Sequence, residues 1–330
     1  MRSYRTSRFS AVAQRAAMTV LVLACAVATA QTFPNGQLRI ISPYPPGGGT
    51  DVLGRVIAQR YTERFNQPAI VDNRPGANGT IGTAFVAKAA PDGLTLLLVP
   101  AGHAANPSLY KSLPYDQARD LAPVSQLTSG PLVLVVYPSL PVRSVKELVA
   151  LAKARPGDLN FGSSGNGALP HLSAELFNVM AGTKMTHVPY KGPSAAVADL
   201  MSGQIALYYM NVTQAVPLVA ANRLRALGVT SPRRSATAPQ IPTIAEQGLP
   251  GFDMTNWYGM LLPSATPKDM INAIYTEVRN IVSLPDTRKS LADMGMVVEA
   301  TTPDEFTRFL QRESAKYVKV IQAAGIKGTL

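Results

Sequence analysis

Two glycine-rich segments of the sequence have the composition of backbone anion sites. One runs from Tyr44 to Asp51 and the other from Ser163 to His171, and each lies between an apolar run and a stretch with helical spacing. Glycine has no Cβ atom, so backbone N–H groups in such a segment can approach an anion closely. A helix that begins there adds about half a positive charge at its N-terminus. We therefore expect two anion-binding loops that face each other across a cleft, with a tight strand-to-helix turn as the alternative for each.

Neither segment matches a nucleotide-binding or hydrolase signature. Gly47 and Gly49 supply the first two glycines of a dinucleotide fingerprint, but Val52 stands at the position of the third. No Walker A motif occurs anywhere in the chain. Around Ser164, Asn166 replaces the last glycine of a nucleophile elbow. These departures argue against nucleotide binding and serine hydrolysis.

The titratable residues offer little for catalysis. His103, His171 and His187 are the histidines of the chain, and no two of them have the helical spacing of a metal pair. His103 and His171 each follow the end of a predicted strand and could reach a ligand or lie at the surface, whereas His187 is expected to pack within a strand. Asp51 is expected in the first turn of a helix, where its negative charge interacts favourably with the helix dipole. No carboxylate pair suggests acid–base chemistry, and we expect no enzyme activity, catalytic residue, metal or cofactor.

The first thirty residues have the pattern of a secretory signal peptide. A basic start without acidic residues contains Arg2, Arg5, Arg8 and Arg15. Residues 16–30 are uncharged and end in Ala28-Thr29-Ala30, a small-x-small cleavage site, so cleavage after Ala30 is expected. Cleavage would remove four arginines and lower the net charge from +11 to +7. Lipidation at Cys25 is a minor alternative, because residues 22–25 loosely resemble a lipobox.

Length and composition limit the class of protein. A chain of 330 residues suggests about two domains. With 46% hydrophobic and 15% charged residues, it is too apolar to be disordered, and no apolar run is long enough to span a membrane. The basic residues are scattered, which argues against nucleic-acid binding. The single cysteine excludes a disulfide within the chain.

Apolar runs alternate with helical patterns along the chain. Strands are expected at residues 38–41, 69–71, 94–99, 132–136, 159–161, 185–188, 205–209 and 224–229. Their continuous apolar character predicts an α/β fold with a parallel sheet buried on both faces. Helices are expected to begin at four N-cap residues, namely Thr50, Ser144, Thr266 and Thr302.

An ordered series of motifs resembles the Bug-type substrate-binding proteins, the periplasmic receptors of tripartite tricarboxylate transporters. The motifs are YPPGG at 44–48 with Asp51, NRPGANG at 73–79, APDG at 90–93, NPSLY at 106–110, LPYD at 113–116, SSGNG at 163–167 with His171, HVPYKG at 187–192, ALGVTS at 226–231, PTIAEQGLPG at 242–251 and WYG at 257–259. The resemblance extends over the whole chain after residue 30.

The resemblance implies an α/β, two-domain periplasmic-binding-protein fold of the Venus-flytrap, type II kind, with two crossover strands and a ligand cleft between the domains. Domain 1 would comprise residues 31–131 and 257–330, and domain 2 residues 132–256, with crossover strands near 132–136 and 259–262. It implies a periplasmic monomer that closes on a small carboxylate and delivers it to the membrane subunits of the transporter. A sensor that signals to a membrane receptor, and an exported serine hydrolase using Ser163 or Ser164, are the alternatives.

The expected ligand-binding residues lie in the two glycine-rich segments and around them. They are Tyr44, Pro46, Gly47, Gly48, Gly49, Thr50, Asp51, His103, Ser163, Ser164, Gly165, Asn166, Gly167, His171, Tyr190, Asn211 and Trp257. The family often has acidic residues where Ala206 and Met210 stand in this chain. Because such acids would suit a ligand ammonium group, we expect a plain organic acid rather than an amino acid as the ligand.

Overall fold

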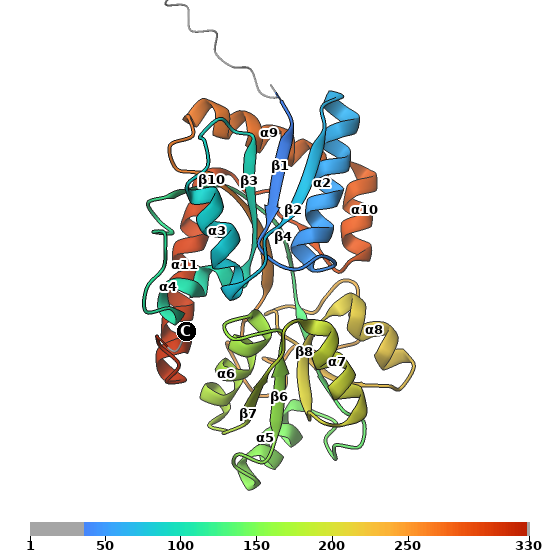
Figure 1. The fold of residues 1–330 in the computed structure, drawn as a ribbon. Coiled ribbons are helices and arrows are strands. Elements are labelled where there is room, and N and C mark those ends of the chain that lie inside the picture. Colours follow the sequence, from blue (N-terminus) through green and yellow to red (C-terminus); the bar gives the residue numbers. More distant parts are fainter. Residues whose placement is uncertain (1–35, 329–330) are drawn as a thin grey trace, which may run out of the picture. The chain divides into compact units, whose positions relative to one another are not determined.

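The structure is a computed structural model that describes residues 36–328. The predicted signal peptide, its cleavage site and Cys25 lie outside the described residues, so export stays a prediction. Within residues 36–328 no helix combines the length and the apolar character needed to cross a membrane. The described strands form two sheets with helices packed against them (Figure 1).

Sheet 1 has six strands in the order β11, β4, β10, β3, β1, β2. The strands are β1 (Leu38–Ser42), β2 (Ala69–Asn73), β3 (Thr95–Pro100), β4 (Leu121–Gly130), β10 (Asn256–Pro263) and β11 (Val297–Val298). β1 runs parallel to β2 and β3, whereas β10 runs antiparallel to both β3 and β4. The sheet is therefore mixed, with β10 and β11 running opposite to its other four strands.

Sheet 2 has five strands in the order β7, β6, β8, β5, β9. The strands are β5 (Leu132–Val136), β6 (Asn160–Ser163), β7 (Thr186–Pro189), β8 (Leu207–Asn211) and β9 (Arg225–Val229). β6 is parallel to β7 and β8, and β5 is antiparallel to β8 and β9. Sheet 2 is therefore mixed too, and the expectation of a parallel sheet is wrong for β5, because an apolar run buried on both faces does not reveal its direction.

The chain passes between the two sheets twice. It leaves sheet 1 at Pro131, the single residue between β4 and β5, and returns between β9 and β10. The predicted crossover segments 132–136 and 259–262 correspond to β5 and β10, the first strand after each passage. The predicted α/β fold with two sheets and two crossovers is confirmed.

Helices follow most of the strands and cover the sheets (Figure 1). They are α2 (Gly49–Phe65), α3 (Thr80–Ala87), α4 (Asn106–Leu109), α5 (Val145–Ala154), α6 (Leu169–Ala181), α7 (Pro193–Ser202), α8 (Val212–Ala220), α9 (Lys268–Ser283), α10 (Pro285–Asp293) and α11 (Pro303–Ala323), with short 3-10 turns η1 (Ala77–Gly79) and η2 (Ala101–Ala105). Several of them begin at the carboxyl end of a strand, which places their N-termini at one edge of the sheet.

Two of the four predicted N-caps are confirmed. Thr302 begins α11 with a full capping box, because its side chain accepts from the Glu305 N–H and Glu305 accepts from the Thr302 N–H. Ser144 caps α5 by accepting from the Glu147 N–H. Ser144 and Glu147 do not form a full capping box, because the Glu147 carboxylate accepts from the N–H of Arg143, at 2.6 Å, rather than from that of Ser144.

The other two predicted N-caps are wrong by one or two residues. The N-cap of α2 is Gly48, and the Thr50 hydroxyl instead pairs with the Ser42 hydroxyl at 2.8 Å. The N-cap of α9 is Pro267, so Thr266 precedes the helix. The start of α2 therefore has no capping side chain, which matters for the site described below.

Trp257, at the start of β10, attaches α11 to sheet 1. Its ring is 1% exposed and meets Phe306 and Phe309 of α11 edge-on, at centroid distances of 5.9 and 5.4 Å. Its Nε1–H donates to the Glu313 carboxylate at 3.1 Å. The structure thus places this expected ligand-binding residue in the core, where a large ring with one polar tip finds both packing and an acceptor.

Trp257→Phe should lower the free energy of unfolding by about 1–3 kcal/mol, because it leaves Glu313 without its buried indole donor. Urea unfolding followed by circular dichroism would measure the loss. Glu313→Gln is the matched control: it keeps an amide oxygen to accept from the indole, so its loss should be smaller. A Trp257→Phe variant as stable as the wild type would contradict this account of the contact.

Candidate functional site

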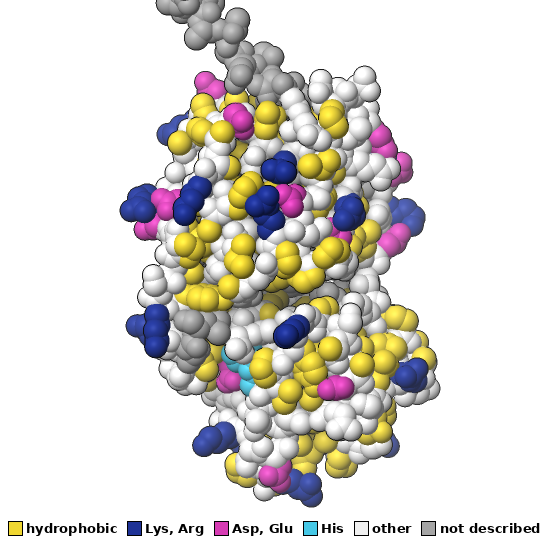
Figure 2. Space-filling model, viewed as in Figure 1, with side chains coloured by type: hydrophobic (Ala, Val, Ile, Leu, Met, Phe, Trp, Pro, Cys, Tyr) yellow, Lys and Arg dark blue, Asp and Glu magenta, His cyan; other side chains and the backbone are white. Residues whose placement is uncertain are grey.

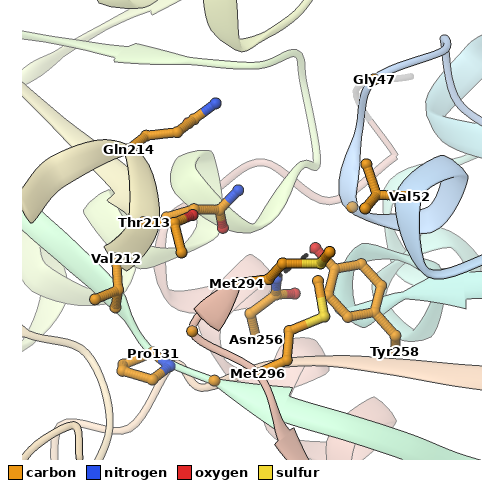
Figure 3. Close-up of a pocket in the computed structure, with 14 residues that line it drawn as sticks. Gly47, Val52, Pro131, Val212, Thr213, Gln214, Asn256, Tyr258, Met294 and Met296 are labelled. Carbon is orange, nitrogen blue, oxygen red and sulfur yellow. Dashed lines mark hydrogen bonds between the residues drawn. The ribbon is translucent and has the colours of Figure 1, made fainter. Parts of the chain in front are cut away.

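A cavity of about 130 Å³ lies where the first turns of α2 and α8 approach the ends of β4 and β10 (Figure 3). From the α2 side it is lined by Gly47, Gly49 and Val52, and from the α8 side by residues 211–214. Gly130, Pro131, Asn256, Tyr258 and residues 294–296 complete the lining. The cavity therefore joins elements of both sheets, and Figure 2 shows a hollow in the surface between them.

The lining of this cavity is uncharged among the described residues, and it offers hydrogen-bond donors. Thr213, Gln214, Asn211, Asn256 and Tyr258 supply polar side chains. The first N–H groups of a helix have no partner within the helix. Gly48 has no side chain to cap α2, and Asn211 makes no side-chain cap bond to α8. Two uncapped helix N-termini, each with a partial positive charge, therefore meet at one neutral cavity, which suits an anion.

The loop before α2 needs glycine at two of its three glycine positions. Gly47 has a φ of +81°, in the left-handed region that favours glycine. A Cβ atom on Gly49 would overlap the hydroxyl of Tyr258 and lie 2.5 Å from the ring carbon that carries it. Gly48 differs, because its φ is −77° and a Cβ there would meet only the Pro45 carbonyl, at 3.4 Å. Gly49 thus allows the start of α2 to lie directly against β10.

Asp51 holds this loop in place rather than facing the cavity. Its carboxylate accepts from the Gly47 N–H at 3.0 Å and pairs with both Nε and a terminal nitrogen of Arg55, each at 3.0 Å. Burial by itself would raise the pKa of Asp51, but hydrogen bonds from Arg55, Gly47 and Asn73 outweigh it and lower the pKa. The carboxylate is thus ionised and neutralised locally, so it does not repel an anion at the start of α2.

The second glycine-rich segment is held by two histidines, one buried and one half-buried. The Ser163 hydroxyl lies 2.6 Å from His187 Nε2 and also bonds with the backbone of Gly165. The Gly167 N–H donates to His171 Nδ1 at 3.1 Å, so this nitrogen carries no proton. The His171 and His187 rings stack at 3.8 Å. The segment therefore has its conformation set by hydrogen bonds to two stacked imidazoles.

The pair of Ser163 and His187 is a nucleophile–base contact that sequence reasoning missed. Two features of its surroundings are unfavourable for hydrolysis. Ser163 is fully buried, so a substrate does not reach its hydroxyl. Burial, followed by the neighbouring His171, lowers the pKa of His187 to about 3, whereas an effective general base has a pKa near the working pH. The contact stabilises the loop.

The two glycine-rich segments approach each other at Asn78. The Tyr44 hydroxyl donates to the Asn78 backbone and side-chain oxygens at 3.2 and 3.1 Å, and Asn78 donates to Asn106 at 2.8 Å. The absent Cβ of Gly167 leaves room for the Asn78 amide, which lies 3.0 Å from that position. Burial raises the pKa of Tyr44, as do the nearby phenols of other tyrosines. The asparagine-rich motif at 73–79 was the sequence signal for this contact.

The cavity contains only part of the expected site. Of the expected residues, Gly47, Gly49 and Asn211 line it, whereas residues 163–167 and His171 lie outside its lining. The Tyr190 hydroxyl donates to Asp199 at 2.6 Å, and Pro46 and Asn166 are exposed. Ser164 lies beside the Tyr208 hydroxyl, which is buried. Thr213, Gln214, Asn256, Met294 and Met296 were not expected, because nothing in their local pattern marks them.

His103 belongs to a different cavity. It is 2% exposed in η2 and lines a space of about 670 Å³ beside Tyr110, Tyr115 and α11. Burial lowers the pKa of His103 to about 3, so the imidazole is neutral. The structure therefore does not bring His103 to the cavity between α2 and α8. Among the described residues, no group of three or more His, Cys, Asp and Glu could hold a metal ion.

Comparisons with known proteins agree on one family. The profile described as "Tripartite tricarboxylate transporter family receptor" matches residues 53–326. BugT of Bordetella pertussis is 36% identical over 301 residues, which cover 91% of this chain and 92% of that protein. A solved R. palustris structure with adipate has a TM-score of 0.83 at 35% identity, covering 89% of this chain and 99% of that chain. MatC from Rhodopseudomonas palustris with bound malate has a TM-score of 0.79 at 29% identity, covering 88% and 99%.

Asp51→Asn should destabilise the protein by about 1–3 kcal/mol at pH 7, because it weakens the charge-assisted bonds to Gly47 and Arg55. Since folding lowers the pKa of Asp51, its contribution is present above the unfolded pKa of about 3.9 and is lost as the pH falls through the folded pKa. Chemical unfolding at pH 7 and pH 3 should show the difference from wild type shrinking in acid. Asp158→Asn, on an exposed turn, controls for loss of one surface charge. An equal difference at both pH values would contradict the prediction.

Proposed function

We propose that this chain, which belongs to the tripartite tricarboxylate transporter receptor family, binds a small organic carboxylate in the cavity between α2 and α8. The membership confirms the resemblance to Bug-type receptors seen in the sequence. The observation that carries the proposal is the meeting of two uncapped helix N-termini at an uncharged cavity. Relatives solved with adipate and with malate support the ligand class.

The electrostatics of the cavity favour an anion without a cationic group. Backbone N–H groups and neutral donors solvate a carboxylate without an opposing side-chain charge. An amino acid would also bring an ammonium group, and no carboxylate among the described residues lines this cavity to pair with it. Met210, where the family often has an acid, is fully buried in the core of sheet 2. A plain organic acid is therefore the better ligand.

The ligand would couple the two sheets. The lining of the cavity comes from α2 on one side and α8 on the other, so a carboxylate held by both helix N-termini stabilises their approach. The two passages between the sheets support division into a domain of residues 31–131 and 257–330 and a domain of residues 132–256. In this proposal the protein is a periplasmic monomer, cleaved after Ala30, that delivers its ligand to the membrane subunits of a transporter.

Thermal melting with matched ligands tests the proposal. The protein is unfolded and refolded first, which removes any retained ligand, and is then melted with mono-, di- and tricarboxylates and with the neutral amides of the same acids. A ligand at a hundred times its dissociation constant adds about 2.7 kcal/mol, which raises the midpoint by several degrees. We expect a shift with at least one acid and none with its amide. Equal shifts with acid and amide would contradict a site built for an anion.

Gly49→Ala should weaken binding of such an acid at least about tenfold, because the added methyl group displaces either the Tyr258 ring or the start of α2. Isothermal titration would measure the change. Gly54→Ala is the matched control in the same helix: its Cβ would meet Val71 at 3.3 Å and faces away from the cavity lining. If both variants bound alike, α2 would not form the site.

A further inference from the structure

The floor of the cavity is a short turn that follows α10. Met294, Gly295 and Met296 all line the cavity and are partly buried. Figure 3 shows the two thioether side chains lying beside Asn256 and the ring of Tyr258, opposite the residues of α8. The turn is far along the chain from both glycine-rich segments, and it brings the softest apolar side chains of the lining to the centre of the site.

This turn is fixed by its neighbours on both sides. Gly295 has a φ of +72°, and a Cβ atom on Gly130 would overlap its carbonyl oxygen. On the other side, the Cβ position of Gly295 lies 3.3 Å from Val212, at the start of α8. The strand that follows pairs with β4, and the Thr128 hydroxyl contacts the Met296 sulfur at 3.8 Å. The methionines are thus presented by a well-supported element.

The chemistry of this floor is unfavourable for a hydroxyl group. A thioether donates no hydrogen bond and accepts only weakly, and Val52, Val212 and Pro131 extend the apolar surface. On the same side, the Asn256 amide donates to the Tyr258 hydroxyl at 3.1 Å, which occupies one N–H and one acceptor site of these two polar groups. A ligand hydroxyl placed against the methionines would lose its water without gaining an equivalent partner.

We propose that Met294 and Met296 are specificity-determining residues that select organic acids with an unsubstituted hydrocarbon body over their hydroxylated counterparts. The inference rests on the proposed function, which places the carboxylate at the helix N-termini and leaves the body of the ligand against the methionines. The proposed selection concerns the hydrocarbon body of the ligand and does not depend on how many carboxylates the ligand carries.

Isothermal titration of the ligand-stripped protein with paired acids tests the inference. The pairs are adipate with 2-hydroxyadipate, succinate with malate, and butyrate with 3-hydroxybutyrate. In each pair that binds, the unsubstituted acid should bind about 10- to 100-fold more tightly, the range in which an apolar pocket discriminates against an added hydroxyl. Equal or tighter binding of the hydroxylated acid would overturn the inference and leave the proposed function standing. Failure of every acid to bind would overturn both.

Variants then assign the preference to the methionines. Met296→Gln and Met294→Gln keep the length of the side chain and add an amide, so each should reduce the ratio within a pair at least about fivefold. Met296→Leu should preserve the ratio, because it keeps the apolar surface. Met270→Gln is the matched control, since Met270 lies on α9 and outside the cavity lining. Melting curves and circular dichroism show that each variant folds. A ratio unchanged in both glutamine variants would overturn the assignment.

Discussion

The approach of the α2 backbone to β10 is the constraint on which the site depends. Gly49 lies so close to the Tyr258 hydroxyl that no side chain fits between them. Because the Gly49 backbone lies against the Tyr258 ring, the first turn of α2 is exposed at the cavity without a capping side chain. Asp51 completes the arrangement by holding Gly47 in its left-handed conformation and by sharing its charge with Arg55. The result is a positive helix end with no competing anion.

The two glycine-rich segments use glycine for different purposes. Before α2, glycine allows close approach to β10 and leaves the helix end open. Before α6, part of the segment already has partners, since Ser163 bonds to His187 and the Gly167 N–H bonds to His171. Buried polar groups that already have partners do not need a ligand, whereas uncapped N–H groups at a cavity do. The place of the second segment in the lining is taken by the start of α8.

Two sheets joined by two passages allow the site to respond to its ligand. Each sheet contributes one helix N-terminus to the cavity, and the turn at 294–296 touches the start of α8 from the side of sheet 1. A carboxylate that binds more tightly when the two helix ends are close together would shift the protein toward that arrangement. The size of the shift equals the difference in binding free energy between the two arrangements. In the proposed function the body of the ligand lies against Met294 and Met296, so affinity and selectivity would arise from different elements.

Local pattern alone determined much of this protein. The apolar runs predicted β1, β2, β3 and the strands of sheet 2, and the N-cap Thr302 followed by Pro303 predicted the start of α11, because burial and capping leave their pattern in neighbouring residues. It missed β4, whose residues 121–130 mix apolar and polar types around Pro123, and α8, which contains Pro217. The direction of β10 and the partners of Trp257 and His103 depend on residues far apart in the chain. Composition predicted an anion site and placed part of it in the loop before α2. Only tertiary packing decided that α8 and the turn at 294–296 line the same cavity, because this comes from proximity to Gly49 and Tyr258 rather than from their own sequence.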